Sequence, residues 1–322
     1  MPNFSGVWTL KEHGVAVKGD RWQVYLNNRG LFGGGYASSI VDTIQYIDIT
    51  STGDATDFGD LSGNRYLLAG CSSVERGVFG GGDSSASSRT NIIEYVTIAS
   101  TGNATDFGDL SAAKSLLSGL ASATRGIFGG GDTSGGSGQI DVIEYITIAS
   151  TGDVTDFGNL DTARRDLSSC ASTTRGVFGG GEVVTTKQNM IDYITIASTG
   201  NATDMGDLTV ARMYISSSSN STRGLFGGGY TGSNSDVIDY ITIASTGNAT
   251  DFGDLVAATQ SPSATSNQLR VVFAGGNSGS VTNVMQFVTI ASTGDTTDFG
   301  DLTVATTRMN AGTISGAHGG LA

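Results

Sequence analysis

The chain has 322 residues and carries 17 Lys and Arg against 30 Asp and Glu, a net charge of −13, which excludes a surface built to coat nucleic acid. With 49 Gly, 2 Pro and 38% hydrophobic residues, the composition fits neither a disordered nor a collagen-like polymer. Two cysteines and two histidines exclude a disulfide scaffold, zinc-finger spacing and most histidine-based metal sites. Export by a signal peptide is not expected, because the start of the chain from Met1 to Leu10 has no apolar h-region. Membrane insertion is not expected either, because no run of ~18 apolar residues occurs.

Residues 1–28 fit no repeat and are predicted to form an N-terminal extension. The stretch from Gly6 to Trp22 is rich in apolar side chains, which is unusual for a free tail. Trp8, Leu10 and Trp22 are therefore predicted to dock the extension onto another protein.

Residues 29–322 are built from six copies of one repeat. Each copy has a glycine segment like Arg76-Gly-Val-Phe-Gly-Gly-Gly and a second segment like Tyr95-Val-Thr-Ile-Ala-Ser-Thr-Gly-Asn-Ala-Thr-Asp-Phe-Gly-Asp-Leu. The interval from the Tyr or Phe to the Asp of Thr-Asp-Phe-Gly never changes, and neither does the interval from that Asp to the next glycine segment, as from Asp106 to Gly129. All length variation is therefore confined to one connection. The copies lie near 29–75, 76–124, 125–174, 175–222, 223–269 and 270–308.

Each repeat is predicted to form four short strands. A run of small residues comes first, then the glycine segment, then an alternating stretch such as Val142 to Ile148, and last Thr-Asp-Phe-Gly-Asp-Leu after a Ser-Thr-Gly-Asn/Asp turn. Four strands in ~40 to 50 residues, repeated, indicate a blade of a β-propeller. The predicted fold is all-β, a six-bladed propeller of four-stranded blades. A β-solenoid is the competing architecture, but its coils are shorter and its ends need caps.

The C-terminal end of the chain is predicted to close the ring. The constant interval that separates Asp57 from Gly80, counted on from Asp298, reaches Leu321, the position equivalent to Gly33. The preceding tail aligns with the small-residue first strand that the first copy lacks. Residues 309–322 are therefore expected to supply the innermost strand of the first blade.

The glycine triplet ending the second strand, the Tyr in the third and the aromatic residue in the fourth resemble the kelch repeat. The chain differs from that pattern because Phe or Met replaces the usual Trp and follows a longer insert. The stretch from Gly6 to Trp22 is similar to the short leader of repeat domains in structural proteins of tailed phages, especially cyanophages.

These resemblances imply a non-enzymatic protein of the virion tail or capsid surface. Other virion proteins and a host-surface glycan are its expected partners. A cellular, lectin-like propeller is the alternative. A hydrolase or copper oxidase is the weakest hypothesis, because the sequence offers two scattered histidines and no paired carboxylates at the variable mouth of the ring.

One arginine and one aspartate recur at the same place in every repeat and are predicted to staple neighbouring blades through arginine–carboxylate or turn-capping bonds. The arginines are Arg29, Arg76, Arg125, Arg175, Arg223 and Arg270, and the aspartates are Asp57, Asp106, Asp156, Asp204, Asp251 and Asp298.

Three other features are assigned structural roles. Asp54, Asp57 and Asp60 could form a calcium loop, but Gly-Asn and Gly-Asp pairs are ordinary turn residues and a closing Glu is lacking, so neither a metal nor a cofactor is predicted. The glycine triplets lack the Gly-Lys-Ser/Thr of a phosphate loop and are expected to let blades approach closely. Cys71 and Cys170 are expected to pack in the core.

The binding site is predicted on the face of the ring where the connections vary in length. Most of the basic residues outside the repeated arginines fall in the links from the fourth strand to the next repeat. Cations and tyrosines around one mouth suit an anionic or sugar-like ligand, although they could also serve only to solubilise the loops. The predicted ligand-binding residues are Arg65, Tyr66, Lys114, Arg164, Arg165, Arg212, Tyr214 and Arg308.

Overall fold

The computed structural model describes residues 27–321 except 86–87, 136–137 and 310–311. The predicted docking side chains Trp8, Leu10 and Trp22 lie outside the described residues. The first strand already begins at Asn27, two residues before the predicted start of the propeller. In the part of the chain that the structure describes, no helix is long and apolar enough to span a membrane.

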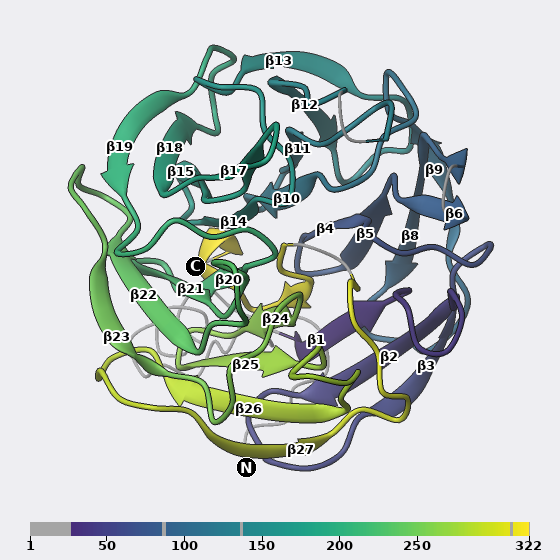
Figure 1. Cartoon of the computed structure of the whole chain (residues 1–322). Coiled ribbons are helices and arrows are strands. Elements are labelled where there is room, and N and C mark those ends of the chain that lie inside the picture. The colour runs from purple at the N-terminus through teal and green to yellow at the C-terminus, as the bar shows by residue number, and fades with distance from the viewer. Residues whose placement is uncertain (1–26, 86–87, 136–137, 310–311, 322) are drawn as a thin grey trace, which may run out of the picture.

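The predicted six-bladed propeller is confirmed: six antiparallel four-stranded sheets surround one axis (Figure 1). The first blade is closed by both ends of the chain, and the other five are continuous in sequence. From the axis outward, the strands of blades one to three are β28 (Ser315–Gly316), β1 (Asn27–Gly33), β2 (Thr43–Asp48) and β3 (Thr56–Asp60); β4 (Ala69–Ser72), β5 (Arg76–Gly80), β8 (Ile92–Thr97) and β9 (Thr105–Asp109); and β10 (Ser118–Ala121), β11 (Arg125–Gly129), β12 (Val142–Thr147) and β13 (Thr155–Asn159).

The strands of blades four to six follow the same order: β14 (Ser168–Ala171), β15 (Arg175–Gly179), β18 (Met190–Thr195) and β19 (Thr203–Asp207); β20 (Ser216–Ser219), β21 (Arg223–Gly227), β22 (Val237–Thr242) and β23 (Thr250–Asp254); and β24 (Ser263–Ser266), β25 (Arg270–Ala274), β26 (Val284–Thr289) and β27 (Thr297–Asp301). Two small ribbons, β6 (Asp83–Ser85) with β7 (Ser88–Arg89) and β16 (Glu182–Val183) with β17 (Thr186–Lys187), extend the variable connections. A short 3-10 helix, η1 (Gly319–Leu321), follows β28.

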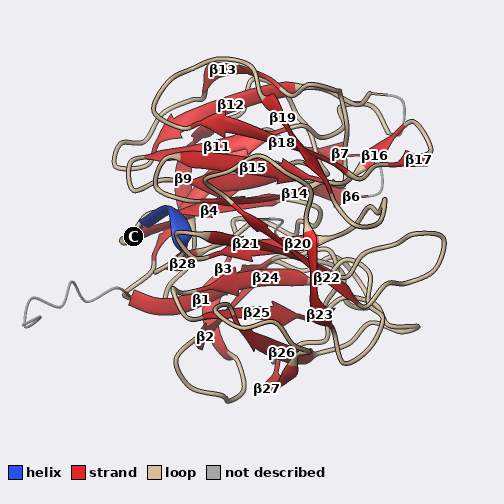
Figure 2. Cartoon of the chain, turned by 90° about the vertical axis from the view of Figure 1, so that its left-hand side faces the viewer, coloured by secondary structure: helices blue, strands red, loops and turns tan. Residues whose placement is uncertain are grey.

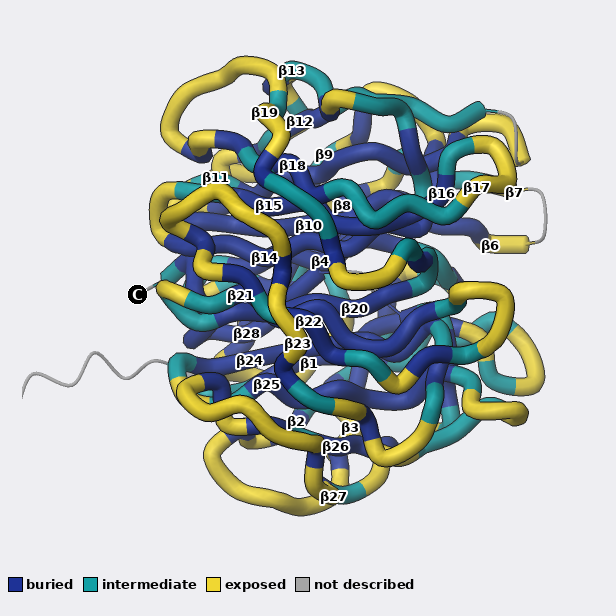
Figure 3. The backbone as a smooth tube through the Cα atoms, turned by 60° about the vertical axis from the view of Figure 1, so that its left-hand side comes forward, coloured by how far each residue is buried: buried dark blue, intermediate teal, exposed yellow. Residues whose placement is uncertain are grey.

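The core lies between blades, because its clusters combine side chains of two neighbouring blades, such as Val78 and Phe128. The inner strands of the ring are buried (Figure 3). A Cβ on Gly33 would lie 2.4 Å from Cε1 of Phe79, so only glycine leaves room for the next blade's phenylalanine. The same relation holds for Gly80 and Phe128, where the distance would be 2.9 Å. The expectation that the glycine segments let blades approach closely is therefore confirmed.

The predicted closure by the C-terminal tail is also confirmed, but the paired strand is shorter than expected and comprises only Ser315–Gly316. Strand β28 pairs with β1, and Leu31 N donates to Ile314 O at 2.9 Å. The tail does more than complete one sheet, because residues 312–321, which we call the axial plug, run through the middle of the ring. Thr313 Oγ1 lies 2.6 Å from Ser218 Oγ of blade five, and Ser315 Oγ donates to Ser266 O of blade six. The plug therefore binds blades that the sequence did not connect to it.

Candidate functional site

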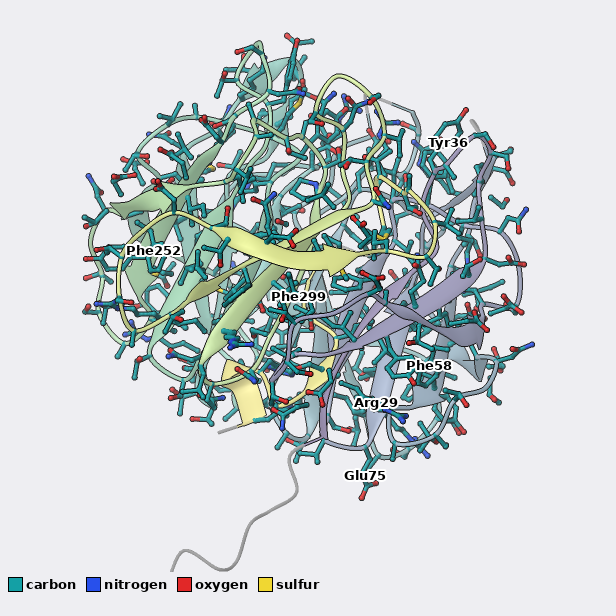
Figure 4. All side chains as sticks on the ribbon, turned by 90° about the horizontal axis from the view of Figure 1, so that it is seen from below. Arg29, Tyr36, Phe58, Glu75, Phe252 and Phe299 are labelled. Carbon is teal, nitrogen blue, oxygen red and sulfur yellow. The ribbon has the colours of Figure 1, made fainter. Side chains whose placement is uncertain are left out.

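The two faces of the ring differ in how regular they are. One face holds the ribbons β6–β7 and β16–β17 and the other variable connections, and we call it the variable face (Figure 2). On this face each link after a fourth strand bridges to a variable connection, as Tyr66 does to Asp83 and Arg165 to Glu182. The opposite face holds Arg29 and Glu75, whereas Tyr36 lies on the variable side (Figure 4).

The repeated arginines do staple neighbouring blades, but their acceptor is a backbone carbonyl. Arg125 Nη1 donates to Ile196 O of the next blade at 2.8 Å while its guanidinium lies 4.6 Å from the ring centroid of Tyr145. All six arginines stack in this way on the Tyr or Phe of their own blade. The repeated aspartates, such as Asp57, are exposed instead. The predicted arginine–carboxylate staple is therefore wrong in its acceptor.

Turn-capping bonds between blades do occur, but they come from the Asn or Asp that follows the glycine of each turn and not from the repeated aspartates. Asn103 Oδ1 accepts the backbone N–H of Asp60 in the preceding blade at 3.1 Å, and Asp54 Oδ1 does the same for Asp301. These side chains belong to the Gly-Asn/Asp turns, so their oxygens are used between blades. Within the described residues no group of three His, Cys, Asp or Glu could hold a metal ion.

Four of the eight predicted ligand-binding residues are buried and cannot form an exposed cationic ring. Each lies in the link before a blade and forms an ion pair with an acid on the third strand of that blade. The Lys114 Nζ to Glu144 Oε2 distance is 2.8 Å, with both side chains 2% exposed. The four pairs are Arg65 with Glu94, Lys114 with Glu144, Arg164 with Asp192, and Arg212 with Asp239.

The other two blades show that cation and acid change together. Where the link carries Thr259 or Thr306, the third strand carries Gln286 or Gln45. Gln45 Oε1 accepts from Thr303 N at 2.6 Å, so an amide replaces the carboxylate where no cation is present. This internal covariation is visible in the sequence and would have identified the pairs. Burial of an unpaired charge is costly, which explains why both members change.

The other four predicted residues are partly exposed. Arg165 pairs with Glu182 at 2.7 Å and with Asp132 at 2.9 Å, which holds it between two variable connections. Tyr66 packs on Tyr36, with ring centroids 6.2 Å apart. Tyr214 and Arg308 lie at the axis, with the Arg308 guanidinium 5.6 Å from the centroid of the Tyr214 ring.

At the axis the structure brings together six residues, of which the sequence had nominated only Tyr214 and Arg308. One residue from each link has a left-handed backbone, with φ between 52° and 61° although none is glycine. Each donates its N–H to the carbonyl of the equivalent residue in the preceding link at 2.9 to 3.3 Å, which closes a ring of six hydrogen bonds. This axial ring consists of Leu67, Leu116, Asp166, Tyr214, Ser261 and Arg308.

The axial ring surrounds a small pocket with a volume of about 40 Å³. Its deeper wall is apolar, because the residue that follows each ring residue is buried Leu, Ile, Pro or Met. Asp166 is 6% exposed, and burial raises the pKa of its carboxyl group to about 7 although Arg165 lies nearby. The charge of Asp166, followed by burial, raises the pKa of Tyr214 to about 12.

Wider grooves occur on the opposite face. One of about 410 Å³ is lined by residues such as Thr124, Arg125 and Leu321. The guanidinium of Arg125 already binds Ile196 O, so the charged group of this groove is used by the scaffold.

The remaining rare side chains are buried. Cys71 and Cys170 are free and buried, and burial raises the pKa of both thiols, so the prediction of core packing is confirmed. His318 of the axial plug is 3% exposed, and burial lowers its pKa to about 4.

Comparison with known proteins adds no functional assignment. No model of a known protein family matches the chain, and no curated protein was found to be similar to it. Its function therefore has to be inferred from the variable face and the axial pocket themselves.

Proposed function

We propose that the chain is a non-enzymatic recognition protein, a kelch-like propeller on the tail or capsid surface of a tailed-phage virion. Its variable face contacts a host surface or a neighbouring virion subunit. The virion assignment is supported by the likeness of residues 6–22 to phage leader segments. The recognition role is supported by the distribution of differences among the six repeats.

That distribution is the observation on which the proposal depends. The opposite face repeats the same arginine–carbonyl bond in every blade. On the variable face the connections differ in length, and the axial ring carries five different residue types at one repeat position. Binding residues are commonly placed on loops that a rigid scaffold supports. A scaffold with one irregular face fits recognition better than it fits a purely structural spacer.

The test blocks one face at a time. Val184, between β16 and β17, is 64% exposed on the variable face, and Glu75 is exposed on the opposite face. We expect a bulky maleimide polymer on Val184→Cys to abolish binding of the chain to host cells or to isolated virion subunits. The same polymer on Glu75→Cys should leave binding intact. The native thiols of Cys71 and Cys170 are buried and will not react.

The opposite pattern, with binding lost only for the polymer at position 75, would show that the other face carries recognition. Labelling of native particles with an antibody to the chain tests the virion assignment separately. Particles that stay unlabelled in preparations where the free protein is detected would favour a cellular protein instead.

A further inference from the structure

We infer that the axial pocket binds a neutral, hydroxyl-rich ligand such as the edge of an uncharged sugar, held between the carboxylate of Asp166 and the guanidinium of Arg308. This inference rests on the proposed recognition role and adds to it a ligand class. It also narrows the anionic or sugar-like ligand that the sequence suggested to an uncharged one, because most of the expected cations are consumed in buried ion pairs.

Asp166 is a buried carboxyl group in the wall of the pocket. Its Oδ2 atom is buried and accepts no hydrogen bond from the described residues. The nearest cation is Arg165, whose Nε lies 3.5 Å away and whose other nitrogens are bound to Glu182 and Asp132. A buried carboxylate oxygen without a donor is costly, and a hydroxyl group entering the pocket would supply one.

The pocket is lined by side chains of opposite charge. Arg308 is the cation on the axial ring and Asp166 is its acid, so their formal charges offset each other once the Asp166 carboxyl group, whose pKa is about 7, is ionised. A pocket whose two charges offset each other, and whose lining also includes Tyr214 and Ser261, favours a ligand that is itself neutral and offers both donors and acceptors. A hydroxyl group does so, because it has one donor and two acceptor positions. Tyr214 adds an aromatic ring against which the apolar face of a sugar can pack.

The size of the pocket and the position of its opening limit which part of a ligand can enter. A volume of about 40 Å³ holds about three or four hydroxyl-sized groups at roughly 10–15 Å³ each, so the edge of a ligand enters while its body stays at the mouth. The axial plug fills the channel on the other side, where Thr313, Ser315 and His318 are buried. Entry is therefore from the variable face.

The residues of the axial ring have a strained backbone. Glycine adopts left-handed geometry without cost, and the chain places glycine at most of its other positive-φ positions. At the axial ring it keeps side chains instead, although a Cβ makes left-handed geometry unfavourable. Strain of this kind is expected where the side chains themselves are needed.

The experiment measures binding of the full chain to methyl glycosides of neutral hexoses and to the matching uronic acids, by titration calorimetry and saturation-transfer NMR, up to roughly 50 mM. We expect at least one neutral glycoside to bind and its uronic acid to bind more weakly. Asp166→Asn should weaken binding by about tenfold or more. Asparagine tolerates left-handed geometry, so this variant should remain folded.

Asp236→Asn is the matched control, because Asp236 is exposed on the same face and outside the pocket. It should bind like the unmodified chain. Tighter binding of the uronic acids, equal binding by the Asp166→Asn variant, or no glycoside binding at all would overturn the inference. If polymer at position 184 blocks recognition while no glycoside binds, only the ligand class is wrong. If a glycoside binds at Asp166 but the polymer has no effect, the pocket is confirmed and the recognition role fails.

Discussion

At the scale of single residues, the buried ion pairs show how a charge can serve the scaffold rather than the surface. Arg164 and Arg212 are 0% exposed, and each reaches both a carboxylate and at least one backbone carbonyl group. Because the pair lies between a link and the following blade, it fixes the position of both. Charge reversal at Arg164 would therefore unfold the protein and could not report on ligand binding.

The covariation of cation and acid predicts strong coupling between Lys114 and Glu144. Lys114→Thr or Glu144→Gln alone leaves a buried charge without its partner and should lower the free energy of unfolding by ~3 kcal/mol. The double variant copies the Thr and Gln of blades one and six and should recover at least half of that loss. Urea unfolding of the four proteins measures the coupling. If the loss in the double variant equals the sum of the losses in the two single variants, Lys114 and Glu144 are not energetically coupled.

His318 predicts a change of stability with pH. Its Nδ1 accepts from Gly320 N and its Nε2 faces Ser72 O, each at 3.1 Å, so the neutral ring fits its site and the charged ring does not. The pKa falls from 6.5 to about 4 on folding. As pH falls, the unfolded chain therefore binds a proton at His318 before the folded chain does. The free energy of unfolding decreases between pH 6.5 and pH 4, by ~3 kcal/mol in total.

Asp166 acts in the opposite sense, because a raised carboxyl pKa makes the folded chain bind the extra proton between pH 4 and 7. The histidine contribution must therefore be measured as a difference between His318→Gln and the unmodified chain. We expect this difference to favour the variant progressively from pH 6.5 to 4. A difference that stays constant with pH would contradict a buried neutral histidine.

At the scale of strands and turns, each blade is joined to the next by the same small set of bonds. The arginine at the start of the second strand binds a carbonyl of the following blade, and the turn before the fourth strand caps the outer strand of the preceding blade. The close approach requires glycine, since a Cβ on Gly59 would lie 2.5 Å from the backbone of Gly102. The invariant spacings of the repeat follow from these contacts.

Substitutions at Arg125 test how much the arginine–carbonyl bond between neighbouring blades stabilises the protein. Arg125→Ala removes the bond to Ile196 O and the stacking on Tyr145, and should lower the free energy of unfolding by ~2 kcal/mol. Arg125→Lys should restore only part of this, because an ammonium lacks the planar stacking surface. Asp156→Asn, at the exposed aspartate that the sequence nominated as a partner, should change stability by less than ~0.5 kcal/mol. A loss at Asp156 equal to that at Arg125 would restore the carboxylate as the acceptor.

At the scale of the whole molecule, stability depends on the C-terminal tail. The axial plug hydrogen-bonds to blades two, five and six as well as to β1 of the first blade. An open ring would expose the inner edge of β1 and the hydroxyl-lined channel together. Loss of the plug is therefore expected to affect all blades rather than one.

Removing residues 312–322 should abolish the cooperative unfolding transition, as followed by circular dichroism during thermal and urea unfolding. A gentler variant is Gly320→Ala, whose Cβ would lie 1.8 Å from Ala121 O and should destabilise the entire chain by ~2 kcal/mol. Gly63→Ala is the control, because no atom lies within 4 Å of a Cβ at Gly63. A truncated chain that unfolds like the full one would show that the tail is not needed for closure.

The sequence by itself determined the fold, because its information is local and periodic. The two constant intervals of the repeat, from Tyr95 to Asp106 and from Asp106 to Gly129 in one copy, set four strands per repeat, and the second of them assigned the tail to the first blade. The regular spacing of the sequence repeat corresponds to a regular arrangement of blades, because every blade makes the same contacts with its neighbours.

Only the tertiary structure decided which charges are available and where the site lies. Lys114 and Arg165 look alike in the sequence, yet one is buried with Glu144 and the other lies between two variable connections. Asp166 and Arg308 are far apart in the chain and meet at the axis because the ring closes. The physical reason is that burial and charge pairing depend on neighbours brought together by closure, and these are not encoded in the spacing of any one repeat.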